Sequence, residues 1–379
     1  MRGGEVQSQI QAGLEGVVAS ASSICFVDGR EGRLLYQGYD IHDLAEHCTF
    51  EEVVYLLWHG DLPSRPQLEA LRRELGAARA LPPAVQGLLS GLPRTANPMD
   101  VLRTVVSALA LYDADLEDRS REGNLRKAAR LVAQFPTIVA AYHRMRQGQA
   151  PVAPQAEAGH AADLLRMLFG REPDPEHARA MDVALILHAD HELNASTFAA
   201  RVTAATLSDI YAAVTSAIGT LKGPLHGGAN AAVMELLQEM GTLDRVEPVV
   251  LEKLARKEKI PGFGHRVYRT EDPRVRHLRP LSQRLGEKAG DLRWFQMTRK
   301  MEEVVMRERH LFANVDLYSA SAYAAMGITP DLFPAIFAVS RISGWTAHIL
   351  EQYADNRLIR PRAEYIGPRR REFIPLDRR

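Results

Sequence analysis

The chain has 379 residues, of which 46% are hydrophobic and 25% charged, and its 47 Lys and Arg residues balance 47 Asp and Glu residues. These values are typical of a globular protein with a large core, and the length predicts two domains. The neutral balance argues against a general nucleic-acid or membrane-surface binder, because either needs a basic surplus. Two cysteines, Cys25 and Cys48, are too few for a disulfide framework, and no Cys-x-x-Cys pair offers a zinc site. No stretch resembles a secretory signal, a transit peptide or a membrane span, which predicts a cytoplasmic protein.

Helical patterns follow one another along most of the chain. Residues 23–36, with Asp28-Gly29 between two short apolar runs, predict one hairpin. Residues 147–159 are rich in Gln, Pro and Ala and are expected to form a surface loop. Cap and breaker residues predict helices from Thr49 (with Glu52) to Gly60, from Asn97-Pro98, from Asp174-Pro175, from about Asp209 to Gly223-Pro224, and from Gly228 to Gly241. The fold class is therefore predicted to be mainly α.

Several common enzyme signatures are missing. The run Gly262-Phe263-Gly264 begins like a dinucleotide-binding fingerprint, but Val267 stands where the third glycine is needed and no strand is expected before it. The sequence has neither a Gly-Lys-Ser/Thr phosphate loop nor a Gly-x-Ser-x-Gly nucleophile turn. These absences argue against several large nucleotide-binding and hydrolase classes.

Four of the 13 histidines lie in unusual settings. His188 and His191 are three residues apart in His-Ala-Asp-His-Glu and would share one face if a helix continued through them. His226 precedes a predicted helix N-terminus, where backbone amides disfavour a protonated imidazole and favour a neutral donor to a developing oxyanion. His265 follows Gly264 in a loop whose backbone could approach a ligand closely.

Each of these signals also has a structural or metal-binding interpretation. His188 lies on an apolar stripe, where a histidine is commonly a hydrogen-bonded core residue. His188, His191 and Asp190 could instead form the metal site of a hydrolase, although the spacing of a His-Glu-x-x-His site is absent. No single motif decides between these alternatives.

Taken together, the motifs resemble the citrate synthase family. Any one of them is weak evidence, but all of them in the family's order form a specific signal that spans about residues 13–367. The matching segments are residues 188–197, 221–230, 261–269, 314–319, 340–345 and 356–362, with 13–17 and 36–41 similar to the family's opening.

The resemblance implies a fold and a reaction. It implies a large helical domain, residues 1–227 plus 328–379, with a small helical domain, residues 228–327, inserted in it. The implied reaction joins acetyl-CoA to oxaloacetate and then hydrolyses the thioester, with no metal and no cofactor besides the CoA substrate. Asp316 would be the base, His226 the donor to the thioester oxygen, and His265 the group that polarises the oxaloacetate carbonyl. Oxaloacetate would be bound by His191, His226, His265, Arg274, Arg341 and Arg360.

The resemblance also implies binding partners. In the family, the arginine that Arg360 matches reaches into the site of the partner subunit, so a homodimer is expected. No nucleic acid or membrane partner is expected. For Arg269 a solvated surface charge is nearly as good an interpretation as a phosphate contact, and Arg266 and Lys259 are further cationic candidates. The residues expected to contact CoA are Pro261, Gly262, Phe263, Gly264 and Arg269.

Other functions remain open at this stage. A 2-methylcitrate synthase would use the same residues with propionyl-CoA, and one extra methylene discriminates by only about 1–3 kcal/mol. A metal-dependent hydrolase and a non-catalytic relative are alternatives from other classes, although a full set of His226, His265 and Asp316 argues against the latter. The family pattern begins near the start of this chain, which predicts a dimer without NADH control.

Overall fold

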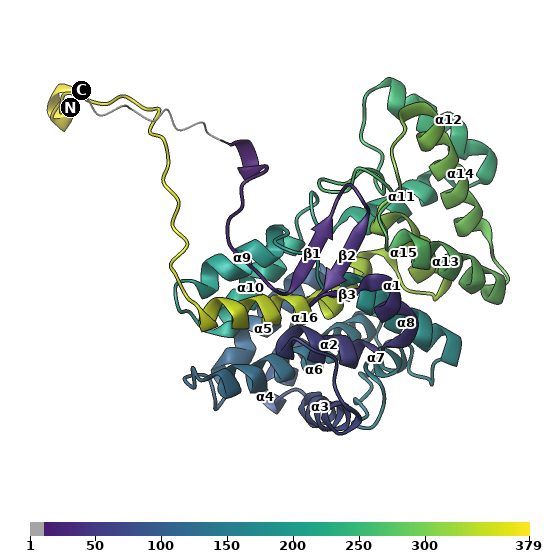
Figure 1. Ribbon diagram of the computed structural model, residues 1–379, viewed down its shortest axis with the longest axis horizontal. Helices are drawn as coiled ribbons and strands as arrows, with labels where there is room; N and C mark the ends of the chain where they lie inside the picture. Colours follow the sequence, from purple (N-terminus) through teal and green to yellow (C-terminus); the bar gives the residue numbers. More distant parts are fainter. Residues whose placement is uncertain (1–10) are drawn as a thin grey trace.

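A computed structural model describes residues 11–379, and its architecture is mainly helical (Figure 1). One antiparallel sheet lies near the N-terminus and consists of β1 (Cys25–Asp28), β2 (Arg33–Tyr36) and β3 (Tyr39–Asp40). Asp28 pairs with Arg33 across the turn, which confirms the predicted hairpin. The strand β3 is not expected from the sequence, because two residues are too few to show alternation.

Ten helices of the described chain precede residue 222. They are α1 (Ile41–His47), α2 (Phe50–His59), α3 (Arg65–Ala78), α4 (Pro83–Ser90), α5 (Pro98–Leu109), α6 (Arg121–Arg146), α7 (His160–Phe169), α8 (Pro175–His188), α9 (Ala195–Ala204) and α10 (Ile210–Leu221). The remaining helices are α11 (Ala229–Met240), α12 (Leu243–Ala255), α13 (Val275–Ala289), α14 (Arg293–Arg309), α15 (Val315–Ala325) and α16 (Phe333–Ala354). Short 3₁₀ turns are η1 (Ala12–Leu14), η2 (Ala110–Tyr112), η3 (Pro330–Leu332) and η4 (Leu376–Arg378).

Local capping explains where the predicted helices begin. The Thr49 backbone N–H donates to Glu52 Oε2 at 2.7 Å, and α2 ends at Gly60 in the left-handed conformation. The side chains of Asn97, Asp174 and Asp209 each accept a backbone N–H in the first turn of α5, α8 and α10. The predicted starts of these four helices are confirmed.

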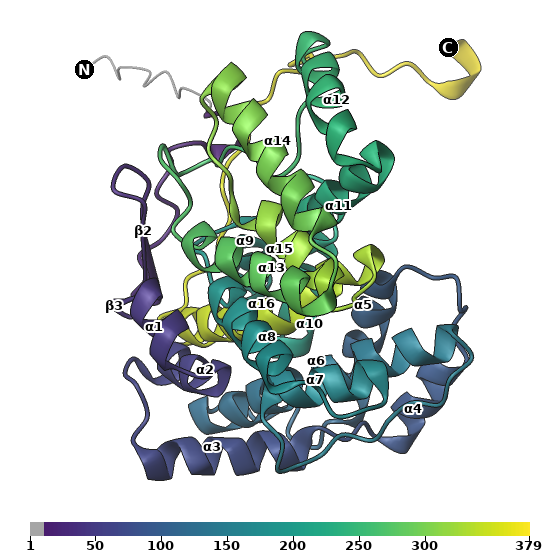
Figure 2. The ribbon, with the colours of Figure 1, turned by 90° about the vertical axis from the view of Figure 1, so that its right-hand side faces the viewer.

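Helix α16 runs through the middle of the molecule (Figure 2). Buried side chains occupy all its faces, from Phe333 to Gln352, and it packs against α2, α6, α8, α9 and α10. A helix that is apolar all round belongs in the interior of a protein. Polar side chains on α16, such as Arg341 and His348, are therefore held inside the core.

Helices α11 to α15 pack mainly against one another and form a group at the upper right of Figure 1. They meet the rest of the chain where α11 packs on α16 and α13 on α8. At the surface, Lys288 of α13 forms ion pairs with Asp174 (2.7 Å) and Glu176 (3.1 Å) at the start of α8. The domain division at residues 227/228 and 327/328 stays a prediction.

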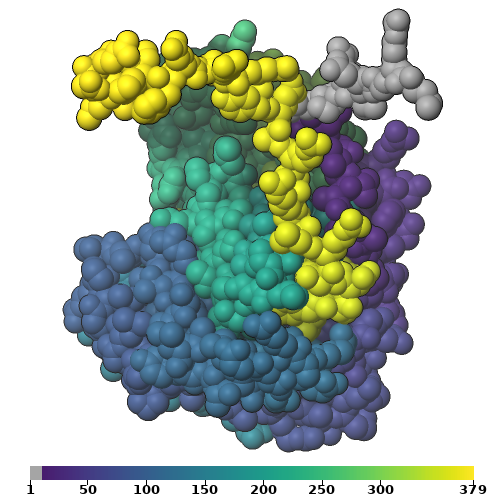
Figure 3. Space-filling view, turned by 90° about the vertical axis from the view of Figure 1, so that its left-hand side faces the viewer, coloured from purple at the N-terminus to yellow at the C-terminus, as the bar shows by residue number. Residues whose placement is uncertain are grey.

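The segment after α16 leaves the helical body as an extended chain (Figures 1 and 3). Its apolar side chains are exposed, including Leu358, Tyr365, Ile366 and Phe373. Cys25 and Cys48 are both buried and unpaired. Among the described residues, none of the helices combines the length and the apolar content that crossing a bilayer demands.

Candidate active site

Apart from Arg360, the predicted site residues come from five separate segments. His191 lies in the turn after α8, and His226 in the turn before α11. His265 and Arg274 lie in the loop between α12 and α13. The others are Asp316 in the first turn of α15 and Arg341 in the buried middle of α16.

The predicted shared helix face of His188 and His191 is wrong. Helix α8 ends at His188, and His191 lies beyond it in a turn where Glu192 has a positive φ of 54°. Distant segments hold this turn: the Tyr36 hydroxyl bonds to the Asp190 backbone, and the Gly344 N–H donates to the Ala189 carbonyl at 3.1 Å. The turn therefore follows from tertiary contacts rather than from helical periodicity.

His188 is completely buried and lies 2.7 Å (Nδ1) from the Ala184 carbonyl. Asp190 is bonded instead to His348, whose Nε2 lies 3.2 Å from Asp190 Oδ2. Burial raises the pKa of Asp190, but His348 and Arg341 outweigh burial and lower it. Nowhere in residues 11–379 do three His, Cys, Asp or Glu side chains form a group that could hold a metal ion.

His191 and His265 lie together with Tyr268. The rings of the two histidines are 5.0 Å apart between centroids, and His191 Nε2 lies 3.1 Å from the Tyr268 hydroxyl. Burial, Arg274 and His265 hold the pKa of His191 well below its usual range. His191 is therefore a neutral imidazole at neutral pH.

Backbone contacts define the tautomer of His265. The N–H groups of Val267 and Tyr268 donate to His265 Nδ1 at 3.0 and 3.2 Å, so this nitrogen is an acceptor and the proton lies on Nε2. Burial and the charge of Arg274 lower the pKa of His265 to about 4. The ring is thus a neutral donor through Nε2.

His226 has the opposite tautomer. The Ser196 backbone N–H, at the start of α9, donates to His226 Nε2 at 3.3 Å, and Ser196 Oγ lies 2.8 Å from the same nitrogen. The proton of the neutral ring is therefore on Nδ1. Burial and Arg341 lower the pKa of His226 to about 4. The helix whose first-turn N–H contacts this ring is α9. The sequence points to the start of α11 instead.

Two buried arginines differ in their partners. Arg274 pairs with Asp272 through Nε (2.9 Å) and through one terminal nitrogen (2.7 Å). Arg341 is 1% exposed, donates from Nε to the His188 carbonyl at 2.7 Å, and lies over the Phe337 ring. No carboxylate within residues 11–379 forms an ion pair with Arg341. A buried cation without an acidic partner is costly, so this guanidinium favours an anionic ligand.

Asp316 is half-buried, and its backbone N–H donates to the Asn314 side chain that caps α15. The pKa of Asp316 is raised to about 6, because burial, helped by Asp272, outweighs the opposite effect of Arg274 and Arg341. A carboxylate in this range is ionised at neutral pH and is more basic than an ordinary aspartate, as a general base should be.

The predicted CoA loop is tied to the start of α15. The Asn314 N–H donates to the Gly262 carbonyl at 3.0 Å, and the Gly264 N–H donates to the Phe312 carbonyl at 2.9 Å. Gly262 and Gly264 both have positive φ angles, 86° and 72°. Arg269, Arg266 and Lys259 are exposed, as a phosphate contact or a solvated charge requires.

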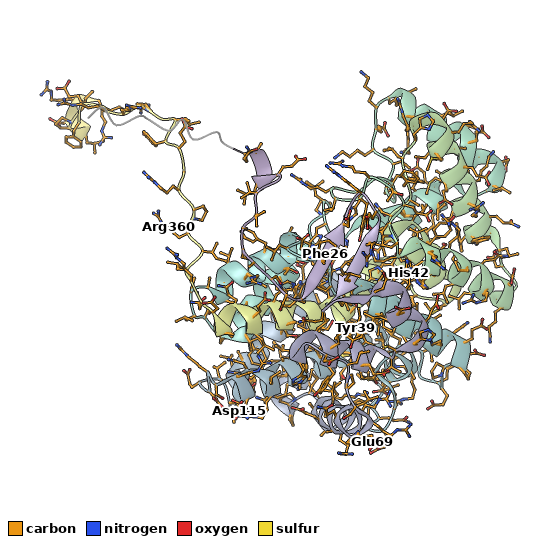
Figure 4. The ribbon with its side chains drawn as sticks, viewed as in Figure 1. Phe26, Tyr39, His42, Glu69, Asp115 and Arg360 are labelled. Atoms are coloured by element: carbon orange, nitrogen blue, oxygen red, sulfur yellow. The ribbon has the colours of Figure 1, made fainter. Side chains whose placement is uncertain are left out.

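The structure brings together His191, His226, His265, Arg274, Asp316 and Arg341, so that the charge of Arg274 or Arg341 shifts the pKa of each of the other four. It does not bring Arg360 to them, because Arg360 projects from the extended segment after α16 (Figure 4). Sequence reasoning missed Tyr268, Asp272 and Ser196. Asp272 alone gives a signal, because it stands two residues before Arg274, whereas the contacts of Tyr268 and Ser196 depend on tertiary structure.

The fold and this site define a helical protein with two buried arginines and three histidines grouped around one aspartate. A family model described as "Citrate synthase, C-terminal domain" matches residues 13–362. The chain belongs to the citrate synthase family, whose members are acyltransferases.

Individual relatives cover almost the whole chain. "Citrate synthase 2" of Bacillus subtilis is 51% identical, over 97% of this chain and 98% of its own. A "2-methylcitrate synthase" of Shewanella oneidensis is 44% identical, over 97% and 98% of the two chains. The citrate synthase of Thermoplasma acidophilum, solved in a ternary complex with carboxymethyl coenzyme A and oxaloacetate, has a TM-score of 0.92 at 31% identity, and covers 97% of this chain and 99% of its own.

Proposed function

We propose that the protein condenses acetyl-CoA with oxaloacetate and hydrolyses the resulting thioester to citrate and CoA. The observation that supports this most is the buried Arg341 guanidinium, which forms no ion pair within the described chain. Burial and Arg274 lower the pKa of Arg341, and the charge of Asp190 offsets this only in part. Two neighbouring buried cations favour a small dianion over a neutral ligand. Oxaloacetate supplies two carboxylates, and a solved relative was crystallised with it.

In the first step, Asp316 removes a proton from the methyl group of acetyl-CoA. The His226 Nδ1–H, left free because Ser196 engages Nε2, donates to the thioester oxygen as negative charge develops there. A neutral donor suits this task, since its pKa of about 4 keeps it uncharged throughout the working range. The reaction itself requires neither metal nor redox cofactor.

In the second step, the enolate carbon forms a bond with the ketone carbon of oxaloacetate. His265 Nε2–H points its proton away from the loop amides and donates to the ketone oxygen, which becomes the hydroxyl of citrate. Arg274, Arg341 and His191 hold the carboxylates. Water then cleaves the thioester and releases CoA as a thiol.

The division into two domains belongs to this proposal. Asp316, His265 and Arg274 lie in residues 228–327, whereas His191 and Arg341 lie in the predicted large domain. Closure of the two domains would align these groups and expel water. We expect oxaloacetate to bind first, and calorimetry with acetyl-CoA should show tighter binding when an oxaloacetate analogue is present. Equal affinity with and without the analogue contradicts ordered binding.

A homodimer also belongs to the proposal. Arg360 is exposed on the segment after α16, away from the other site residues of its own subunit, and this segment has exposed apolar side chains, such as Ile366 (90%) and Phe373 (80%). Apolar side chains exposed along an extended segment are typical of a surface that another chain covers. Light scattering during size-exclusion chromatography measures the oligomeric state, and a monomer would contradict the proposal.

The second candidate function is that of a 2-methylcitrate synthase, because a relative of that name is 44% identical. The two activities differ by one methylene in the acyl pocket. Values of kcat/KM for acetyl-CoA and propionyl-CoA, measured at saturating oxaloacetate, separate them. A clear preference for propionyl-CoA would replace the first candidate with the second.

The central experiment follows thiol release from acetyl-CoA with and without oxaloacetate. We expect release that depends on oxaloacetate and is unaffected by EDTA, which would also exclude the hydrolase alternative. Asp316→Asn should lower kcat by at least about 10³-fold and leave oxaloacetate binding in place, because the base is lost while the cations remain. Turnover by this variant would contradict the assignment of Asp316. Location in the cytoplasm and a role in the tricarboxylic acid cycle are expectations of the same proposal.

A further inference from the structure

The Tyr268 hydroxyl joins two segments of the candidate site. The side chain is 4% exposed, and its oxygen lies 3.1 Å from His191 Nε2. Within residues 11–379, this hydroxyl is the one protein group that forms a hydrogen bond with that nitrogen. A hydrogen bond to one ring nitrogen fixes the orientation of the whole imidazole. Tyr268 therefore determines how the His191 ring faces the site.

The same residue touches His265 through different atoms. Its backbone N–H donates to His265 Nδ1, and the rings of Tyr268 and His265 lie 4.6 Å apart between centroids. The Tyr268 ring also meets His191 edge to face at 5.5 Å. Tyr268 thus contacts two of the histidines that are predicted to bind oxaloacetate, one from each predicted domain.

The position of Tyr268 does not depend on its hydroxyl. The neighbouring Arg269 N–H donates to the Gly29 carbonyl at 2.7 Å, in the turn of the β1–β2 hairpin. Gly29 allows this approach, since a Cβ there would lie 2.1 Å from the Val267 carbonyl oxygen. Phenylalanine at position 268 should therefore occupy the same place and lack only the bond to His191.

We propose that Tyr268 is a positioning residue that orients the His191 imidazole for oxaloacetate. This inference rests on the proposed function. Tyr268 should strengthen the binding of oxaloacetate and have no effect on the removal of the acetyl-CoA proton, because its hydroxyl is bonded to His191 rather than to Asp316 or His226.

Tyr268→Phe tests the inference by calorimetry with oxaloacetate and by steady-state kinetics. We expect the Kd and the KM for oxaloacetate to rise about tenfold, as for the loss of one hydrogen bond, with kcat and the KM for acetyl-CoA within about twofold of wild type. Tyr142→Phe is a matched control: the Tyr142 hydroxyl donates to the Pro93 and Ala96 carbonyls at 2.8 Å, in another part of the molecule. It should lower the melting temperature and leave the oxaloacetate Kd unchanged.

A double-mutant cycle with His191→Asn shows whether Tyr268 acts through His191. In the H191N background, Y268F should change the oxaloacetate Kd by less than about twofold. The same factor in both backgrounds, or an unchanged Kd in Y268F alone, would overturn the inference. Wild-type protein that releases no thiol with oxaloacetate would overturn the proposed function as well, whereas active wild type with an unaltered Y268F overturns the inference alone.

Discussion

At the scale of single residues, the site separates one basic carboxylate from several neutral imidazoles. Burial acts on both kinds of group, but in opposite directions: it raises the pKa of Asp316 to about 6 and lowers those of His226 and His265 to about 4. At neutral pH the aspartate is therefore ionised and the histidines are uncharged donors. This is the distribution of protons that enolate formation requires.

The pH dependence of the activity follows from these values. Below pH 6, protonation of Asp316 removes the base, while His226 and His265 remain neutral until about pH 4. We expect log kcat/KM for acetyl-CoA to fall with a slope of one below about pH 6. Initial rates between pH 5 and 9, at saturating oxaloacetate, measure this limb. If log kcat/KM fell with a slope of two, or with an apparent pKa near 7 and flat rates at pH 8, a histidine rather than Asp316 would control the acidic limb.

At the scale of elements, the Gly262 loop and the start of α15 form one unit that positions Asp316. The Gly262 carbonyl accepts the Asn314 N–H, and Asn314 in turn caps the helix through the Asp316 N–H. A Cβ at Gly262 would lie 2.9 Å from both Leu317 Cδ1 and Val233 Cγ2. Little room therefore exists for any side chain between this loop, α11 and α15.

Gly262→Ala should consequently reduce activity as well as stability. An alanine in the left-handed conformation, with a φ of 86°, costs about 1–2 kcal/mol of folding stability. Its Cβ would also press against Leu317, and the resulting shift of α15 would displace Asp316. We expect kcat to fall about tenfold or more and the midpoint of denaturant unfolding to drop. Gly290→Ala is the matched control, with a φ of 69° and no atom within 4 Å of its Cβ. It should lose similar stability from strain but retain kcat, and an equal loss of kcat in both variants would contradict the argument.

The elements also show which features a sequence can predict. Helix starts at Thr49, Asn97, Asp174 and Asp209 depend on side chains that bond to amides two or three residues away, so local patterns locate them. The turn of His191 depends on Tyr36 and Gly344, which are more than 150 residues away along the chain. Family resemblance pointed to the residues of the site, but neither periodicity nor resemblance shows the Tyr268–His191 bond or the tautomers of His226 and His265. These depend on contacts between segments that only the folded chain brings together.

At the scale of the whole molecule, a net charge of zero conceals an uneven distribution of charge. Burial lowers the pKa of Arg274, but the negative charge of Asp272 outweighs burial and raises this pKa. The charge of Arg274 is therefore balanced by Asp272 within the chain. Arg341 forms no ion pair among the described residues and is compensated only in part by the charge of Asp190, and Arg360 lies exposed on a segment that leaves the body. If Arg360 binds oxaloacetate, as proposed, a single subunit does not contain a complete site.

A hybrid dimer tests this incompleteness directly. Asp316→Asn and Arg360→Ala chains, co-expressed with two different tags and purified through both, contain one site with an intact Asp316 and an intact Arg360 from the other subunit. We expect each variant alone to be nearly inactive and the hybrid to recover about half of the wild-type kcat, because one of its two sites is whole. A doubly tagged Asp316→Asn dimer, purified in the same way, controls for the tags and for carry-over of host enzyme. If Arg360 served its own subunit, both sites of the hybrid would be defective and thiol release would stay at the level of this control.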